Sequence, residues 1–239
     1  MIALFSATLF LSAALLFWVQ PMIAKMLLPL LGGGPSVWNT CMVFFQAMLL
    51  GGYTYAHFVS VRLSIRGQVM MHFCLLSLAA LALPLGISDK LVQSLTPESN
   101  PFCWLLGALL LVVGAPFFAT AGTGPLLQKW FSHTGHVLAK DPYFLYSTSN
   151  LGSLISLVGY PVLLESHLRL REQSRFWTSG YLALALLILF CGASVWRFRQ
   201  SHAGGGNNAS RQAGQDTSAR ATDRSEIISG RQQIGRAHV

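Results

Sequence analysis

The segment IALFSATLFLSAALLFWVQPMIA, residues 2–24, contains no Asp, Glu, Lys, Arg or His. The hydrocarbon core of a bilayer is about 30 Å thick, and about 20 apolar residues cross it as an α-helix. No Lys or Arg precedes the apolar run and no small-residue cleavage motif follows it, so the segment lacks the pattern of a secretory signal. It predicts a transmembrane helix that stays in the mature protein.

Five further stretches are comparably long and free of Asp, Glu, Lys and Arg. The chain is 53% hydrophobic and 10% charged, whereas about 25% of the residues of a soluble domain are charged. A soluble fold would place helices that are apolar all round in water, and continuous apolar runs lack the alternation of barrel strands. We therefore expect an all-α, polytopic membrane protein with about six transmembrane helices, near residues 2–24, 36–59, 67–87, 102–125, 143–164 and 177–196.

Residues 197–239 differ sharply in composition from this transmembrane domain, residues 1–196. Gly, Ser, Asn, Gln and Arg dominate them, and apolar residues are few. Such a composition buries too little apolar surface to fold, so it predicts a disordered basic tail. The last six residues, IGRAHV, can be encoded by the start of a common sequencing adapter. We therefore expect the tail to be the end of a truncated reading frame.

Basic residues in the loops predict the orientation, because cytoplasmic loops carry more Lys and Arg. With six spans, both termini lie on the same side of the membrane. That side holds six basic residues close to the membrane, and the opposite side holds five. This count favours cytoplasmic termini. The net charge of +8 indicates attraction to anionic lipid and predicts the bilayer, not nucleic acid, as partner. The six basic residues on the side of the termini are Arg62, Arg66, Lys129, Lys140, Arg197 and Arg199; the five on the opposite side are Lys25, Lys90, Arg169, Arg171 and Arg175.

Polar side chains within the apolar stretches are candidate functional positions, because a polar group in lipid needs a hydrogen-bonding partner. They line a polar cavity, or they form hydrogen bonds between helices. Lys25 lies near an interface, where its long side chain reaches the headgroups. Asn150 lies about two turns into its span, so we expect its amide to be buried against a partner in the bundle. The candidates are Lys25, Asn39, Gln46, Tyr146, Ser147 and Asn150.

Small residues within the spans predict close helix contacts. Gly51, Gly52, Gly152 and Gly159 allow two backbones to approach, and this favours a homodimer formed through small-residue helix faces. Pro125 follows a run of Ala, Thr and Gly, which predicts a kinked or unwound end of the fourth span.

Cysteine and histidine do not form a metal-binding pattern. The four cysteines fall inside predicted spans without a CxxC pair. His133 and His136 have the spacing of two ligands, but no third ligand lies nearer than Asp141. We expect no metal site and no cofactor.

Four longer runs together resemble a known family. They are SAALLFWVQPMIAKM (residues 12–26), LGGGPSVWNTCMVFFQ (31–46), DPYFLYSTSNLGS (141–153) and GYPVLLE (159–165). The chain, over residues 1–196, resembles the membrane half of bacterial fused membrane/spermidine synthase-like proteins. The resemblance implies a multi-pass protein of the bacterial inner membrane, followed by a soluble Rossmann-like domain that resembles a polyamine aminopropyltransferase. It assigns no catalytic residue to the membrane half.

The tail lacks the strands and the Gly-rich turn that such a soluble domain needs. We therefore expect this chain alone not to be catalytic. Its expected role is that of a membrane domain that anchors and feeds an aminopropyltransferase-like enzyme. Two alternatives stay open, a small transporter or permease-like helical bundle and a structural, dimerising membrane module.

Overall fold

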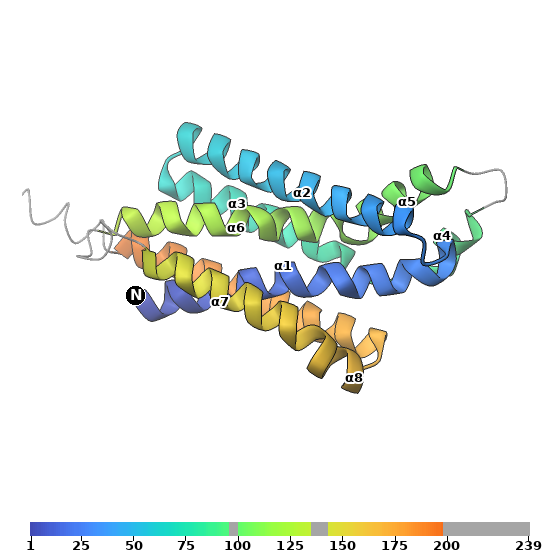
Figure 1. The fold of residues 1–239 in the computed structure, drawn as a ribbon. Coiled ribbons are helices and arrows are strands. Elements are labelled where there is room, and N and C mark those ends of the chain that lie inside the picture. Colours follow the sequence, from blue (N-terminus) through green and yellow to red (C-terminus); the bar gives the residue numbers. More distant parts are fainter. Residues whose placement is uncertain (96–99, 135–142, 198–239) are drawn as a thin grey trace, which may run out of the picture. The chain divides into compact units, whose positions relative to one another are not determined.

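The computed structural model describes residues 1–95, 100–134 and 143–197, and every regular element in these ranges is helical (Figure 1). The predicted tail beyond Arg197 lies outside these ranges, as do Lys140, His136 and Asp141. Four helical segments in the described ranges are long and apolar enough to cross a membrane. They are α1 (Ile2–Leu31), Ile65–Ala82, Pro101–Ser132 and the last described helix, Leu170–Arg197.

Two of these segments are built from shorter elements that follow one another directly. The first, Ile65–Ala82, consists of α3 (Ile65–Ala79) and the 3₁₀ turn η1 (Ala80–Ala82). The second, Pro101–Ser132, consists of α5 (Pro101–Leu109), the π-helical η2 (Leu110–Gly114) and α6 (Ala115–Ser132). The remaining elements are α2 (Pro35–Arg62), α4 (Asp89–Gln93), α7 (Tyr143–Gly159), the π-helical η4 (Tyr160–Leu164) and α8 (Glu165–His167).

The helices α2 and α7 overlap predicted spans but are not among the four most apolar segments. Their composition explains this, because both carry several amide, hydroxyl or glycine residues within their apolar runs. The count of six spans therefore depends on these two helices.

Local sequence signals account for several helix starts. Pro35 occupies the first turn of α2, where a missing N–H costs nothing. The Asn100 side chain accepts hydrogen bonds from the N–H groups of Phe102 and Cys103, at 3.0 and 3.4 Å, and so caps α5. Ser64 caps α3 in the same way, by accepting from the N–H of Gly67.

Of the two predicted alternatives at Pro125, the unwound end is wrong, because α6 continues through Pro125 to Ser132; the kink stays a prediction. A proline removes one helical hydrogen bond, and helices packed against their neighbours tolerate that loss. Here α6 packs against α1, α2 and α3. These contacts keep the segment helical past the proline.

Buried aromatic side chains hold the last described helix against the rest of the unit Met1–Val195. Trp177 and Tyr181 are fully buried. The Trp177 Nε1–H donates to the carbonyl oxygen of Leu15 in α1 at 3.0 Å, and the Tyr181 hydroxyl donates to the carbonyl oxygen of Leu76 in α3 at 3.0 Å. A large apolar side chain thus packs while its polar atom bonds a neighbouring backbone.

Glycines let α1, α2, α6 and α7 approach closely. A Cβ on Gly52 would lie 2.6 Å from the Cβ of Ala121 in α6, and a Cβ on Gly152 would lie 2.5 Å from the carbonyl oxygen of Phe10 in α1. Both distances are shorter than atoms allow, so these two positions require glycine. Gly52 and Gly152 therefore serve contacts inside one chain.

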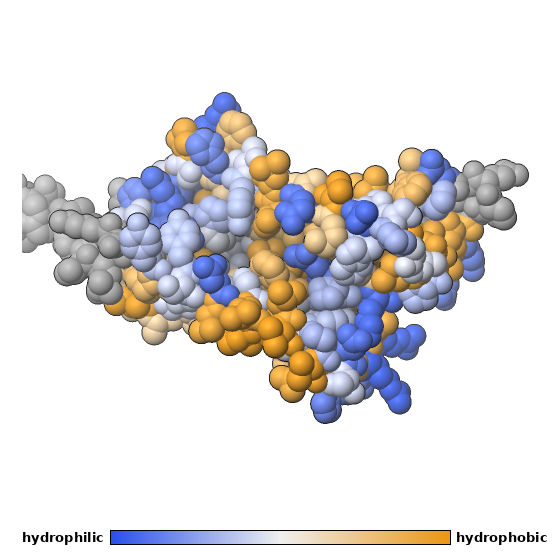
Figure 2. Space-filling view, viewed as in Figure 1, coloured by the Kyte–Doolittle hydropathy of each residue, from blue (hydrophilic) through white to orange (hydrophobic). Residues whose placement is uncertain are grey.

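The outer surface of the bundle is apolar. Leu81 is 80% exposed and Met70 is 73% exposed. In the space-filling view, hydrophobic side chains lie over α2 and α7, and hydrophilic side chains gather around α8 (Figure 2). Extensive exposed apolar surface is unsuited to water and is compatible with a membrane-embedded protein.

Candidate functional site

A cavity of about 680 Å³ lies between α1, α2, α6 and α7. Its lining on α1 runs from Leu9 to Ala24, and its lining on α2 runs from Trp38 to Tyr53. The part on α7 runs from Ser149 to Leu157, and α6 contributes Phe117, Ala121 and Gly124. The cavity thus uses both of the less apolar helices, α2 and α7.

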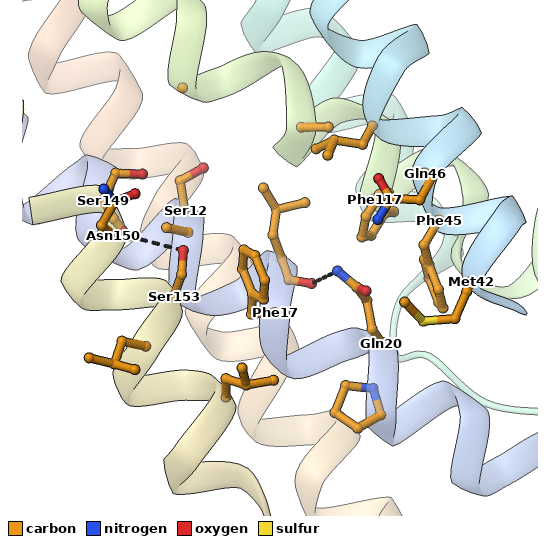
Figure 3. A pocket seen from close by; sticks show the side chains of 18 of the residues that line it. Ser12, Phe17, Gln20, Met42, Phe45, Gln46, Phe117, Ser149, Asn150 and Ser153 are labelled. Carbon is orange, nitrogen blue, oxygen red and sulfur yellow. Dashed lines mark hydrogen bonds between the residues drawn. The ribbon is translucent and has the colours of Figure 1, made fainter. Parts of the chain in front are cut away.

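Six polar lining residues form two groups (Figure 3). The first group, which we call the serine–asparagine group, combines Ser12 of α1 with Ser149, Asn150 and Ser153 of α7. The second, the glutamine pair, consists of Gln20 of α1 and Gln46 of α2. Apolar residues of α1, including Leu16 and Phe17, lie between them along the chain.

Three of the six side chains in these two groups bond to backbone within the bundle. Ser12 Oγ donates to the carbonyl oxygen of Thr120 at 3.4 Å, and Ser153 Oγ donates to that of Ser149 at 3.1 Å. Gln20 Nε2 donates to the carbonyl oxygen of Leu16 at 3.1 Å. A serine that bonds its own helix in this way has little need of a ligand.

The amides of Gln46 and Asn150 differ from these three side chains, since among the described residues no hydrogen bond engages either amide. Both residues are exposed, and both line the cavity. An amide in apolar surroundings without a partner costs several kcal/mol. These two side chains therefore offer donors and acceptors to a molecule in the cavity.

The expectation that Asn150 is buried against a partner in the bundle is wrong, because its side chain is exposed at the cavity. The residue of α7 that makes the interhelical bond is Ser156, whose Oγ donates to the carbonyl oxygen of Ala14 at 2.7 Å. Ser156 lies nearly two turns beyond Asn150, on the side of α7 that packs against α1. The close approach of Gly152 to Phe10 fixes how α7 is rotated against α1, and this rotation directs Asn150 toward the cavity.

The other predicted site residues do not line the cavity. Asn39, Tyr146 and Ser147 are exposed. Lys25 forms an ion pair with Glu165 at the start of α8, and the two side chains are 44% and 38% exposed. The structure thus brings Gln46 and Asn150 to one cavity and leaves the other four candidates outside it.

A buried polar cluster between α2, α3 and α6 was not predicted. His72 Nε2 lies 3.0 Å from Thr123 Oγ1, and Thr123 Oγ1 also donates to the carbonyl oxygen of Ala119 at 3.2 Å. Because the hydroxyl hydrogen is used there, His72 donates through Nε2–H. Gln68 accepts from Trp130 Nε1 at 2.9 Å and donates to the carbonyl oxygens of Ser60 and Leu63.

The geometry of this cluster indicates a structural role. His72 and Gln68 are buried, and their bonds join three helices. A lone histidine in an apolar run gives no signal of such a role in the sequence, since its partner Thr123 lies 51 positions away. Among the described residues no group of three or more His, Cys, Asp and Glu side chains lies close enough to hold a metal ion.

No protein-family model, curated protein or solved structure matches this chain.

Proposed function

We propose that the chain is a six-span domain of the bacterial inner membrane that holds a small molecule in the cavity between α1, α2, α6 and α7. The observation that carries the proposal is the cavity itself, at about 680 Å³ and with two amides in its lining that no described residue engages. Ligand pockets have volumes of about 300–1,000 Å³, and helical bundles form them between helices.

The position of the polar residues supports the six-span count. Polar side chains in membrane proteins face the bundle interior or a cavity, so a spanning helix that lines a cavity is less apolar than its neighbours. α2 and α7 fit this description, because they contribute Gln46 and Asn150. On this proposal α2 and α7 cross the bilayer together with the four more apolar segments, and both ends of the domain face the cytoplasm.

The resemblance to the membrane half of spermidine synthase-like fusion proteins supports a role beside a cytoplasmic aminopropyltransferase-like enzyme. In that arrangement the domain holds the enzyme at the membrane, and the 239-residue chain alone transfers no aminopropyl group. The continuous reading frame in clean genomic DNA tests this part. A downstream domain with a Gly-rich strand-to-helix turn supports it, and a stop codon after Val239 contradicts it.

The same cavity also favours the alternative of a transporter or permease-like bundle. A carrier binds its substrate in such a chamber and releases it on the other side of the membrane. Uptake of the bound molecule into proteoliposomes that contain only this chain would favour the carrier. Binding without uptake would favour the membrane domain of an attached enzyme.

The cavity is tested by filling it. Ser153→Trp places a large side chain in the lining of the cavity, and Ser147→Trp makes the same change on α7 outside it. The chain is purified from membranes in a mild detergent, and native mass spectrometry detects small molecules that stay bound. We expect a bound molecule in the parent and in Ser147→Trp and its loss in Ser153→Trp. No bound molecule in the parent, or equal retention by both variants, would overturn the proposal.

Homodimerisation remains a separate proposal. Gly51, Gly52 and Gly152 face neighbouring helices of the same chain, while a Cβ on Gly159 would meet nothing within 4 Å. A dimer contact through small residues would therefore use the face of Gly159. Cross-linking of a Gly159→Cys variant in membranes tests it, and a monomer alone would contradict it.

A further inference from the structure

The shape of the cavity restricts its occupant. The lining on α1, from Leu9 to Ala24, covers fifteen residue steps, which is about 22 Å at 1.5 Å per residue. The lining on α2, from Trp38 to Tyr53, has the same length. The hydrocarbon core of a bilayer is about 30 Å thick. The cavity is therefore a long slot that runs along most of one bilayer core.

The volume of the slot restricts the size of the occupant. A cavity of about 680 Å³ lies within the range of about 300–1,000 Å³ that is typical of sites for drug-sized ligands. A ligand of that size that extends along about 22 Å is a single extended chain.

The chemistry of the walls restricts the charge of the occupant. None of the described residues that line the cavity is Asp, Glu, Lys, Arg or His. A phosphate or an ammonium group inside it would lose its hydration without an ionic partner, which costs far more than one hydrogen bond returns. Phe17, Met42 and Leu154 supply apolar contacts. The occupant is uncharged and mostly apolar.

The serine–asparagine group and the glutamine pair mark two positions along an extended occupant. Ser12, in the serine–asparagine group, and Gln20, in the glutamine pair, are eight residues apart on α1, which is about 12 Å. Figure 3 shows the two groups on opposite sides of Phe17. Each group contains one amide that no described residue engages, Asn150 in the first and Gln46 in the second. An occupant that satisfies both carries hydrogen-bonding groups at two separate places.

We propose, on the basis of the proposed function, that the slot binds an uncharged single-chain lipid with a second hydrogen-bonding group part-way along its chain. The neutral head, built from hydroxyl and ester groups, lies at Asn150. The mid-chain hydroxyl lies at Gln46. The end of the chain lies toward Trp38, because α2 runs back along α1 from the Gly32–Gly34 turn and its first lining residue is Trp38.

Trp38 provides a built-in reporter, since it lines the slot and is 45% exposed. Bromine quenches tryptophan fluorescence on contact. The probes are three lipids brominated at the chain end, namely a monoacylglycerol with a hydroxyl at mid-chain, the same monoacylglycerol without that hydroxyl, and a lysophosphatidylglycerol. Each is titrated into the purified chain in neutral detergent, and Trp38→Phe identifies the part of the quenching that arises at Trp38.

We expect the hydroxylated monoacylglycerol to bind about 5- to 10-fold more tightly than the plain one, the gain of about one hydrogen bond. Gln46→Leu should abolish this difference, and Asn150→Leu should weaken both neutral lipids about 5- to 10-fold. Asn39→Leu makes the same chemical change on α2 outside the slot and should alter nothing. The anionic lipid should bind more weakly than either neutral lipid.

Equal binding of the two neutral lipids by the parent, or preference for the anionic lipid, would overturn this inference. If no lipid quenches Trp38 while native mass spectrometry still finds a molecule that Ser153→Trp removes, the lipid class is wrong and the proposed function stands. If Ser153→Trp removes nothing, the cavity has no occupant and both fail.

Discussion

Replacing Gly152 by Ala tests the contact between α1 and α7 that places Asn150 at the cavity. The added Cβ would lie 2.5 Å from the carbonyl oxygen of Phe10 and 3.2 Å from its Cα, all backbone of α1. Ordinary contact begins at 3.4 Å, so the two helices must separate by about 0.9 Å. A backbone atom cannot rotate away as a flexible side chain does. The packing between two long helices therefore changes along its length.

Overpacking of this kind costs about 1–3 kcal/mol. Alanine also favours a helix over glycine by about 1 kcal/mol, which offsets part of the loss. Because the clash is with backbone, we expect a cost in the upper part of the first range, about 2–3 kcal/mol, and hence a net destabilisation of about 1–2 kcal/mol. The assay is unfolding of the purified chain in mixed micelles, titrated with a denaturing detergent and followed by circular dichroism.

Gly159→Ala is the matched control on the same helix, since its Cβ would meet nothing within 4 Å. This variant keeps the propensity gain without the clash, so it should be as stable as the parent or more stable by up to about 1 kcal/mol. Equal stability of Gly152→Ala and the parent would refute the packing of α7 on α1 described above. Equal destabilisation by both variants would show that the loss arises from the helix itself.

Three further substitutions have expected effects in the same unfolding assay. Thr123→Val removes the acceptor of the buried His72 Nε2–H and should cost about 1–3 kcal/mol; no loss would show that water reaches the site. Lys25→Met should change stability by less than about 1 kcal/mol, because its ion pair with Glu165 is half exposed, and a larger loss would indicate a pair shielded from solvent. Asn150→Leu should not lower stability, because no described residue bonds its amide; a loss above about 1 kcal/mol would show that the amide is buried at a helix interface.

The sequence predicts the helical class and the approximate positions of the long segments, because a run without charged residues has few other stable forms in lipid. The charge-free run at residues 2–24 lies within α1. Helix starts follow local chemistry, as at Pro35 and Asn100. The outcome at Pro125 differs because contacts of α6 with three neighbouring helices outweigh the local preference.

The direction of each polar side chain is harder to predict, because a helix that is apolar all round has no face that marks the core. Gln46 and Asn150 were predicted as candidates, and the structure places them at one cavity. Gln20 and Ser12 complete its polar lining, but nothing in an apolar run shows which way they point. His72 is found only through a partner on another helix. These features depend on packing between segments far apart in the chain.

The cavity lies within the bilayer only if α2 and α7 cross it, so their topology is the most direct test of the account. Single cysteines are introduced in a chain whose four natural cysteines are replaced by Ala, at Gly33 and Ser64 on either side of α2 and at His133 and Arg171 on either side of α7. Intact cells are treated with a thiol reagent that does not cross the inner membrane. We predict labelling of Gly33→Cys and Arg171→Cys and none of Ser64→Cys and His133→Cys until the cells are broken. Equal labelling within either pair would show that the helix between them does not cross, and would contradict a cavity inside the membrane.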